Sequence, residues 1–298
     1  MPVRISAIIS DYDGTLCPTA SIKSKDDQIP EDLHNVLYEI SQKIPICIIS
    51  SKDFQFLRQK VQFAKIVACI LGIETFHLFQ RPKQSQNFLG NTNLNNSARD
   101  ELGQSDAIIS KYVLSKIDKL LNNSKFLKEL GNMVLNKFQD VKVEQKFTYV
   151  DKILAGLTID YRHIQKWEQY KTNIEPELKK AVLKFIGSTV PKDLYVQTYS
   201  DHPFLDVYSF KYDKGMVMES IVQSLNLGNG GKVMYLGDSE NDNPAFRKAD
   251  LSIGIQSDGR IRTKLDSDYV IEFNELRPFL QKLDSEDFVF NRMSQNVL

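Results

Sequence analysis

The chain has 298 residues, of which 42% are hydrophobic and 26% charged, with 38 basic side chains against 38 acidic ones. This composition is typical of a soluble globular protein and argues against a disordered chain or a membrane protein. The balanced charge provides no strongly basic surface, so neither nucleic acid nor an anionic membrane is expected as a partner. The three cysteines form no CxxC pair and the N-terminus has no secretory pattern, so we expect a reduced, cytoplasmic protein.

The first part of the chain alternates between strand and helix patterns. Residues 3–10 are rich in β-branched and apolar side chains and predict a buried parallel strand. Further strands are predicted at 44–49 and 66–71, and helices at 30–41 and 54–63. After residue 214 the alternation returns, with helices at 216–225, 244–248 and 275–283 and strands at 233–236, 251–255 and 269–271. Such alternation is typical of a doubly wound α/β sheet.

Between these two parts the pattern changes. Residues 83–105 are dominated by Gln, Asn, Ser and Gly, which predicts a polar loop or linker. The predicted elements that follow are helices at 106–122, 125–138 and 164–186 and strands at 141–147, 153–161, 194–199 and 204–210. This order predicts an α+β unit with an antiparallel sheet. We therefore predict a core domain of residues 1–80 and 211–298, interrupted by an inserted α+β domain at 81–210.

Two carboxylates follow the first predicted strand. Asp11 and Asp13 are separated by one residue, so on extended backbone their side chains point to the same side. Like charges this close repel each other unless a cation or a shared proton relieves them. The pair could form a simple turn, since Asp-Gly is a common turn dipeptide. The full string DYDGT at residues 11–15, directly after a buried strand, favours a functional site.

A second acidic cluster follows the strand predicted at 233–236. Its sequence, GDSEND at residues 237–242, would by itself indicate a solvated turn or a helix cap. Together with Asp11 and Asp13, however, Asp238 and Asp242 supply oxygen ligands that suit a hard cation, for which Mg²⁺ is the default. No His or Cys occupies matching positions, so zinc is not expected.

Ser50 and Lys214 complete the set of candidate residues. Ser50 ends the second predicted strand, with Ser51 beside it, and its hydroxyl can either cap the next helix or donate to a phosphate oxygen. Lys214 by itself would be interpreted as a surface lysine. A phosphate beside several carboxylates needs a compensating cation, and lysine is a usual one. Ligands of open α/β sheets bind beyond the carboxyl ends of the strands, where these clusters are expected.

The four clusters, in this order, resemble the motifs of the haloacid dehalogenase (HAD) superfamily of phosphatases. The DxDGT motif is present at residues 11–15, the Ser or Thr after an apolar strand at Ser50, the lysine at Lys214 and the GDxxND motif at residues 237–242. The resemblance implies a Rossmann-like α/β core with an inserted α+β cap at 81–210, because the family places its larger cap between the second and third motifs.

The resemblance also implies a mechanism. Asp11 would attack phosphorus to give an aspartyl-phosphate, and Asp13 would protonate the leaving alcohol and later activate the hydrolytic water. Ser50, Ser51 and Lys214 would hold the phosphoryl group.

The same resemblance implies a Mg²⁺ site. Asp238 would be a direct ligand together with Asp11, and Asp13 would contribute its backbone carbonyl. Asp242, with Asn241, would orient the metal shell and its waters.

The inserted domain is expected to recognise the rest of the substrate. Glu144 and Lys146 form an E-x-K pattern on one predicted strand, and Arg162 follows a tyrosine near the end of the next. This arrangement resembles the cap pattern of trehalose-6-phosphate phosphatases, which implies contacts with sugar hydroxyls or with the phosphate. Mixed charge on a β-hairpin is also typical of a solvated face. The match favours trehalose-6-phosphate, a small-molecule sugar phosphate, as the substrate.

Other functions remain open. The strings GDSEND at 237–242 and SSK at 50–52 resemble mannosyl-3-phosphoglycerate phosphatases and general sugar phosphatases, so mannosyl- or glucosyl-3-phosphoglycerate is the alternative substrate. A phosphomutase is disfavoured because the core of the insert offers mainly Arg162 for a second phosphate. A non-catalytic relative is disfavoured because every catalytic-type residue is present. The sequence gives no indication of oligomeric state.

Overall fold

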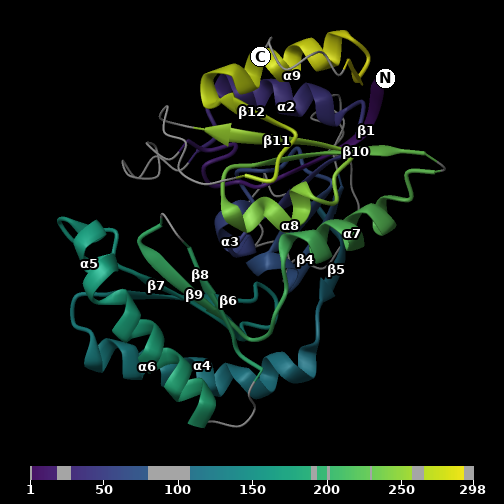
Figure 1. Ribbon diagram of the computed structural model, residues 1–298. Helices are drawn as coiled ribbons and strands as arrows, with labels where there is room; N and C mark the ends of the chain where they lie inside the picture. The colour runs from purple at the N-terminus through teal and green to yellow at the C-terminus, as the bar shows by residue number, and fades with distance from the viewer. Residues whose placement is uncertain are drawn as a thin grey trace.

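The computed structural model describes residues 2–18, 28–79, 108–188, 193–199, 202–228, 230–256 and 265–291. Two sheets organise these residues, one above the other in Figure 1. The larger sheet contains β1 (Val3–Ser10), β2 (Ile46–Ile49), β3 (Ile66–Cys69), β4 (Glu74–Phe79), β5 (Ile108–Leu114), β10 (Lys232–Gly237), β11 (Leu251–Gln256), β12 (Tyr269–Glu272) and β13 (Val289–Phe290). The smaller sheet contains β6 (Lys142–Phe147), β7 (Leu154–Asp160), β8 (Tyr195–Thr198) and β9 (Phe204–Tyr208).

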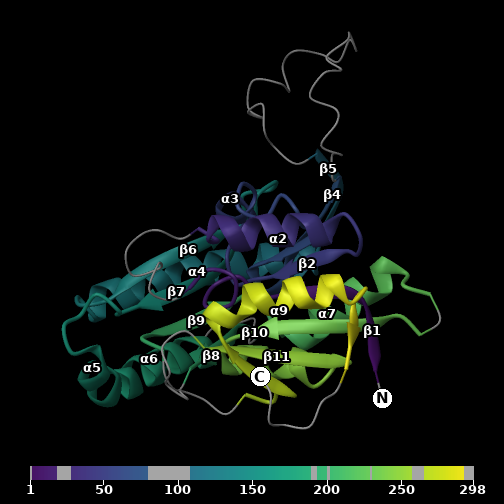
Figure 2. The ribbon, with the colours of Figure 1, turned by 90° about the horizontal axis from the view of Figure 1, so that it is seen from above.

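The larger sheet has the strand order β12-β11-β10-β1-β2-β3-β4-β5. The strands from β12 to β3 are parallel, whereas β4 and β5 add as antiparallel strands at one edge and β13 pairs antiparallel with β1. Helices α2 (Glu31–Ser41) and α9 (Phe273–Ser285) lie on one face, and α7 (Lys214–Leu225) and α8 (Asn243–Phe246) on the other (Figure 1). The view in Figure 2 looks onto α2 and α9. The predicted doubly wound α/β fold is confirmed.

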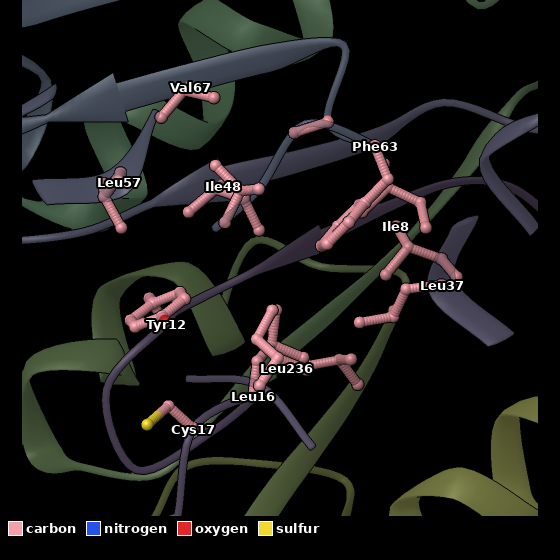
Figure 3. Packing of buried hydrophobic residues seen from close by; sticks show 14 of the residues in the cluster. Ile8, Tyr12, Leu16, Cys17, Leu37, Ile48, Leu57, Phe63, Val67 and Leu236 are labelled. Atoms are coloured by element: carbon pink, nitrogen blue, oxygen red, sulfur yellow. The ribbon is translucent and has the colours of Figure 1, made fainter. Parts of the chain in front are cut away.

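The core of the larger sheet is divided between its two faces because neighbouring strand residues point in opposite directions. Ile8 and Ile48 belong to a fully buried cluster that includes Leu37 of α2 (Figure 3). Ile9 belongs to the cluster on the other face, together with Ile221 of α7. Burial on both faces explains why β2 and residues 7–9 of β1 are continuously apolar, as parallel strands between two helical layers require.

The smaller sheet has the order β6-β7-β9-β8, with every pair antiparallel. Helices α4 (Ile117–Lys137) and α6 (Glu175–Ser188) cover the face that is turned away from the larger sheet (Figure 1). Leu157 and Val207 of the sheet are buried there with Leu130 and Val182 of the helices. The predicted α+β unit with an antiparallel sheet is confirmed, and its uncovered face is turned toward the larger sheet.

The helix predicted at 106–122 is wrong. Residues 108–114 form β5, which pairs with β4 in the larger sheet, and a single helix, α4, replaces the second half of this prediction and the helix predicted at 125–138. Strand β4 had no predicted counterpart. Pairing between β4 and β5 satisfies the backbone of both segments, and this tertiary interaction outweighs the local helical pattern. The predicted boundary at 80/81 lies outside the described residues, and the division into domains stays a prediction.

Two other helices are shorter than predicted. The helix at 54–63 is only α3 (Phe54–Leu57), followed by turns, and the helix at 164–186 is divided into α5 (Trp167–Asn173) and α6. Pro176 stands in the first turn of α6, where its missing N–H and its ring are tolerated, whereas within a continuous helix they would not be. The polar segment at 83–105 lies outside the described residues. Among the described helices, none is long and apolar enough to cross a membrane.

Candidate active site

The predicted polar clusters meet at the carboxyl edge of the larger sheet. Strands β10, β1 and β2 are parallel neighbours, so the residues that follow them leave the sheet side by side. Asp11 follows β1, Ser50 follows β2 and Asp238 follows β10, while Lys214 is the first residue of α7. The Asp213 side chain accepts a hydrogen bond from the backbone N of Met216 at 2.9 Å, and this cap starts the helix at the lysine.

Lys214 links two of the carboxylates. Its Nζ lies 3.0 Å from Oδ2 of Asp11 and 2.7 Å from Oδ1 of Asp242, and only 2% of its side chain is exposed. Burial alone would lower the pKa of a lysine, but Asp11 and Asp242 outweigh it and raise the pKa of Lys214 above its usual value. The ammonium is therefore a fixed positive charge beside Asp11.

Asp242 is fully engaged in hydrogen bonds. Its Oδ1 accepts from Lys214 and from the hydroxyl of Tyr235, both at 2.7 Å. Its Oδ2 accepts from the backbone N atoms of Asp238 and Ser239 at 3.2 and 3.1 Å, and from the Ser239 hydroxyl at 3.0 Å. Because both oxygens are occupied, Asp242 holds the lysine and the 238–239 turn in place, and contributes to the site mainly through its charge.

Gly14 is packed against Asp238. A Cβ atom at position 14 would lie 1.9 Å from Oδ2 of Asp238, and the backbone of Gly14 has a φ of +80°. Each of these two facts disfavours any other residue, the first by overlap and the second by strain. The glycine of the DYDGT string is therefore required for the approach of the Asp238 carboxylate to the residues that follow β1.

Three carboxylates gather beside the Lys214 ammonium, which contacts two of them. Among the described residues, Asp11, Asp238 and Asp242 each offer an oxygen, and these oxygens lie within 4.8 Å of one another. Burial raises the pKa of Asp11 to about 7; Lys214 opposes this shift, and Asp242 adds to it. Burial, followed by the charges of Asp11 and Asp242, also raises the pKa of Asp238 well above its usual range. Surplus negative charge on an all-oxygen donor set fits a hard divalent cation.

Asp13 does not belong to this group of side chains. Its Oδ2 lies 4.0 Å from Nζ of Lys52, and about a quarter of its side chain is exposed. Burial lowers the pKa of Lys52, but Asp13, Glu144 and Asp206 together outweigh it, so the pKa is raised. Since Glu144 and Asp206 belong to the smaller sheet, Lys52 marks the place where the two sheets face each other. Sequence analysis named Lys52 only as part of the SSK string.

The Ser50 side chain is buried, and its Oγ accepts a hydrogen bond from the backbone N of Lys52 at 3.1 Å. Its hydroxyl hydrogen is therefore available to donate to a phosphate oxygen. The carbonyl of Ser51 accepts a hydrogen bond from Nζ of Lys146 at 3.1 Å. This bond joins β6 of the smaller sheet directly to the loop that follows β2.

The uncovered face of the smaller sheet carries a row of polar side chains. Glu144 lies opposite Thr158, Thr158 opposite Asp206 and Asp206 opposite Gln197, on four successive strands. Lys146 occupies the same face two residues from Glu144, with its Nζ 4.0 Å from the Glu144 carboxylate. The burial of Lys146 and the bond to Ser51 place this row beside the carboxyl edge of the larger sheet.

Asp206 is a buried carboxylate that sequence analysis missed. It accepts hydrogen bonds from the hydroxyls of Thr158 at 2.5 Å, Tyr199 at 2.7 Å and Tyr208 at 3.0 Å. Burial and Asp206 raise the pKa of Tyr199 well above its usual value, and Asp11 contributes to the shift, so Tyr199 stands near the carboxyl edge. An acid in the apolar run 204–210, on the same face as Phe204 and Tyr208, was the available signal.

Arg162 makes its ion pair with the last residue of β7. Its Nε lies 2.6 Å from Oδ2 of Asp160, its backbone N donates to Oδ1 of the same residue at 2.8 Å, and its guanidinium stands over the ring of Phe204. Its charge opposes the rise in the pKa of Lys52 and, after Lys146 and Lys52, helps to lower the pKa of Glu144, so Arg162 lies at the border of the polar face. Arg162 therefore lies farther from the carboxyl edge than the other predicted site residues.

Comparison with known proteins agrees with this architecture. Residues 8–277 match the model of the haloacid dehalogenase-like hydrolase family. No curated protein matches the chain significantly in sequence.

Solved structures similar to this one include two phosphatases and a phosphatase-related protein. The C-terminal domain of C. albicans trehalose-6-phosphate phosphatase has a TM-score of 0.62 at 15% identity, with 95% of this chain and 93% of that chain covered. A trehalose-6-phosphate phosphatase related protein has a TM-score of 0.58 at 14% identity, with coverage of 94% and 98%. A sugar phosphatase of HAD subclass IIB has a TM-score of 0.51 at 16% identity, with coverage of 95% and 99%.

Identities this low show a shared fold and nothing finer. The family match, by contrast, spans most of the chain and includes the strands and loops that assemble the site. The predicted superfamily and the prediction of an enzyme are confirmed: the chain belongs to the haloacid dehalogenase-like hydrolases and has the fold of that superfamily's phosphatases.

Proposed function

We propose that the protein is a Mg²⁺-dependent phosphomonoester hydrolase that acts on a sugar phosphate through an aspartyl-phosphate, with trehalose-6-phosphate as the first candidate substrate. The observation that carries the proposal is the buried pairing of Asp11 with Lys214, 3.0 Å apart, beside a polar sheet face. A carboxylate nucleophile needs a fixed cation beside it to accept a phosphate, and this pair supplies both.

The proposed reaction has two steps. An oxygen of Asp11 forms a bond to phosphorus, the ester P–O bond breaks, and the leaving alcohol takes a proton from Asp13. Water then attacks the phosphorus of the aspartyl-phosphate, Asp13 accepts its proton, and inorganic phosphate leaves with the Asp11 carboxylate restored. Asp13 suits this role because its neighbour Lys52 faces the smaller sheet, where the leaving alcohol would lie.

The remaining residues of the carboxyl edge would bind the phosphoryl group and a metal ion. Lys214 and the Ser50 hydroxyl would bind the phosphoryl oxygens, with Ser51 beside them. A divalent cation held by Asp11, Asp238 and the backbone carbonyl of Asp13, with Asp242 adjacent, would neutralise the carboxylates and the phosphate; Mg²⁺ is the proposed ion.

The polar face favours a neutral sugar over a carboxylate-bearing one. Lys146 and Arg162 each have an acidic neighbour on the same sheet, Glu144 at 4.0 Å and Asp160 at 2.6 Å. The charge of this face is thus largely balanced, and it offers both donors and acceptors, which suits sugar hydroxyls. A phosphoglycerate would instead need an uncompensated cation for its carboxylate. This balance supports trehalose-6-phosphate rather than mannosyl- or glucosyl-3-phosphoglycerate.

The test is a phosphate-release assay with Mg²⁺ on trehalose-6-phosphate, mannosyl- and glucosyl-3-phosphoglycerate and simple hexose phosphates. We expect the highest kcat/KM with trehalose-6-phosphate, and loss of activity with EDTA that added Mg²⁺ reverses. A tenfold preference for a phosphoglycerate would contradict the substrate assignment while leaving the reaction intact.

A matched pair of variants tests the nucleophile. Asp11→Asn should reduce phosphate release at least about 10³-fold with every ester, because it removes the attacking charge. Asp140→Asn makes the same chemical change on an exposed turn and should leave the rate unchanged. Normal turnover by the Asp11 variant would refute the mechanism.

A further inference from the structure

The turn that joins β6 to β7, residues 148–153, rests on the far strands of the larger sheet. Oε1 of Glu74, on β4, accepts hydrogen bonds from the backbone N atoms of Tyr149 at 2.6 Å and Val150 at 3.4 Å. On β5, the hydroxyl of Tyr112 donates to Oδ2 of Asp151 at 2.8 Å. The turn is therefore bound by side chains from two strands of the other sheet, beside the carboxyl end of β3.

Glu74 is a buried acid that the proposed reaction does not use. Its side chain is completely buried, and its second oxygen, Oε2, accepts no hydrogen bond from the described residues. Burial raises its pKa to about 7; the Tyr149 and Val150 amides and Tyr112 oppose the shift, while Asp53 adds to it. A buried carboxyl with an oxygen left unpartnered is unfavourable for stability, so its position calls for another explanation.

Aromatic packing adds to the same contact. The ring of Tyr149 lies 5.1 Å from that of Phe54 and 6.1 Å from that of Phe76, centroid to centroid, and the Phe54 and Phe76 rings stack at 3.7 Å. Nη1 of Arg58 donates to the Tyr149 hydroxyl at 3.2 Å. The backbone of Tyr149 is thus held by Glu74 and its ring by residues of the larger sheet and α3.

The turn is connected to the polar row through β6. Lys146, near the end of β6, is three residues before Tyr149, and it makes the hydrogen bond to the Ser51 carbonyl. On the other side, Glu74 pairs with Cys69 across β3 and β4, and the carbonyl of the adjacent Ala68 accepts a hydrogen bond from the backbone N of Ser50 at 3.0 Å. Glu74 is therefore connected on one side to the strand that carries Lys146 and on the other to the loop that carries Ser51, the two partners of the hydrogen bond between the sheets.

We propose that Glu74 is a positioning residue, which fixes the β6–β7 turn on the larger sheet and thereby holds Lys146 and Glu144 over the loop at residues 50–52. Its effect on substrate affinity rests on the proposed function, whereas its effect on the turn does not. A purely structural acid would stabilise the fold without changing how the substrate binds.

The test compares three variants with the intact enzyme. Glu74→Met keeps the length of the side chain and removes the acceptor, Glu74→Gln keeps the acceptor oxygen, and Glu129→Ala removes an exposed acid of α4 as the control. Glu74→Ala serves in place of Met if the sulfur does not fit. Amide hydrogen exchange at Tyr149, Val150 and Lys52 is measured alongside KM and kcat for the best sugar phosphate and for p-nitrophenyl phosphate.

We expect the Tyr149 and Val150 amides to exchange about tenfold faster in Glu74→Met, the factor that corresponds to one lost buried hydrogen bond. KM for the sugar phosphate should rise by a similar factor with kcat changed less than about threefold, and KM for p-nitrophenyl phosphate, which has no sugar, should not move. Glu74→Gln should restore both quantities, and Glu129→Ala should match the intact enzyme.

Two results would overturn the proposal. Unchanged exchange at Tyr149 in Glu74→Met would show that the acid does not hold the turn, and faster exchange with an unchanged sugar-phosphate KM would show that the turn does not position the polar row. If the intact enzyme hydrolyses no phosphate ester, the proposed function fails separately. Exchange of the Lys52 amide, which donates to Ser50, then decides between the two roles: faster exchange supports positioning and unchanged exchange rejects it.

Discussion

The two sheets of this enzyme distribute their polar side chains in different ways. Strands β1, β2 and β10 are covered on both faces, and the charged and hydroxyl groups of the candidate site stand where these strands end, at Asp11, Ser50 and Asp238. The smaller sheet is covered on one face, and its other face carries Glu144 and Asp206 in one row. A sheet buried on both faces concentrates its reactive groups at one edge, whereas a half-covered sheet can spread recognition over an area.

This difference predicts that changes at the edge affect every substrate, while changes on the polar face affect only substrates with a sugar.

The largest effect is expected from Lys214→Met. Loss of the ammonium leaves Asp11 and Asp242 buried without their cation, so we expect phosphate release from every ester to fall about 10³-fold or more. The free energy of unfolding should fall by about 3–5 kcal/mol, as for other buried pairs that lose one partner. Denaturant unfolding and the phosphate assay measure the two effects.

Lys232→Met is the control, because its ion pair with Asp250 is half-exposed and should contribute less than about 1 kcal/mol. Equal losses in the two variants would contradict the special role of Lys214.

The next prediction separates two reasons for a glycine at position 14, its positive φ and its close contact with Asp238. Gly14→Ala places a Cβ atom against Asp238 at a φ of +80°, whereas Gly228→Ala meets a similar φ of +75° with open space around it. Both should lose about 1 kcal/mol of stability through strain. Only Gly14→Ala should also lose activity, by about 10²-fold, because it displaces the Asp238 carboxylate. Phosphate release measured with increasing Mg²⁺ checks this prediction. Equal activity of the two variants would show that the close contact between Gly14 and Asp238 is not needed for the reaction.

The contact between the sheets should carry a pH dependence of stability. The pKa of Glu74 is raised from an ordinary 4.5 to about 7, so between these values the folded protein keeps a proton that the unfolded chain releases. Ionisation of Glu74 therefore lowers stability as pH rises through this window, and the loss is nearly complete above about pH 7. Relative to Glu74→Gln, the intact protein should lose about 2 kcal/mol between pH 5 and pH 8. Urea unfolding of both proteins at the two pH values measures this difference, and a constant difference would contradict it.

The smallest effect is expected on the polar face. Lys146→Ala should raise KM for the sugar phosphate about tenfold, through loss of the bond to the Ser51 carbonyl and of a sugar contact. Turnover of p-nitrophenyl phosphate should change less than about threefold. Lys180→Ala, on the exposed surface of α6 and away from the polar face, is the matched control. An equal effect of Lys146→Ala on both esters would contradict the prediction that the polar face contributes only to binding of the sugar.

Local patterns predicted most of the elements, because strands buried on both faces and amphipathic helices leave clear periodicities. Strand β1 and helix α2 agree with their predicted bounds within one residue. The predictions are wrong where pairing with a segment distant in sequence determines the secondary structure. This is the case at β5, which pairs with β4 across a long segment of sequence. Pairing of this kind satisfies backbone groups that a helix would otherwise satisfy, and no local pattern reports it.

The order of motifs along the sequence was sufficient to predict the family, the α/β fold and the residues of the carboxyl edge, because parallel strands bring their ends to one place whatever the length of chain between them. Only the tertiary structure decided the contacts of those residues. It shows that Asp242 accepts hydrogen bonds at both oxygens and that Gly14 lies against Asp238. It also shows that Lys52, Asp206 and Glu74 belong to the contact between the sheets. The reason is physical, since a hydrogen bond, a close approach or a buried charge depends on distances between segments, and those distances exist only in the folded chain.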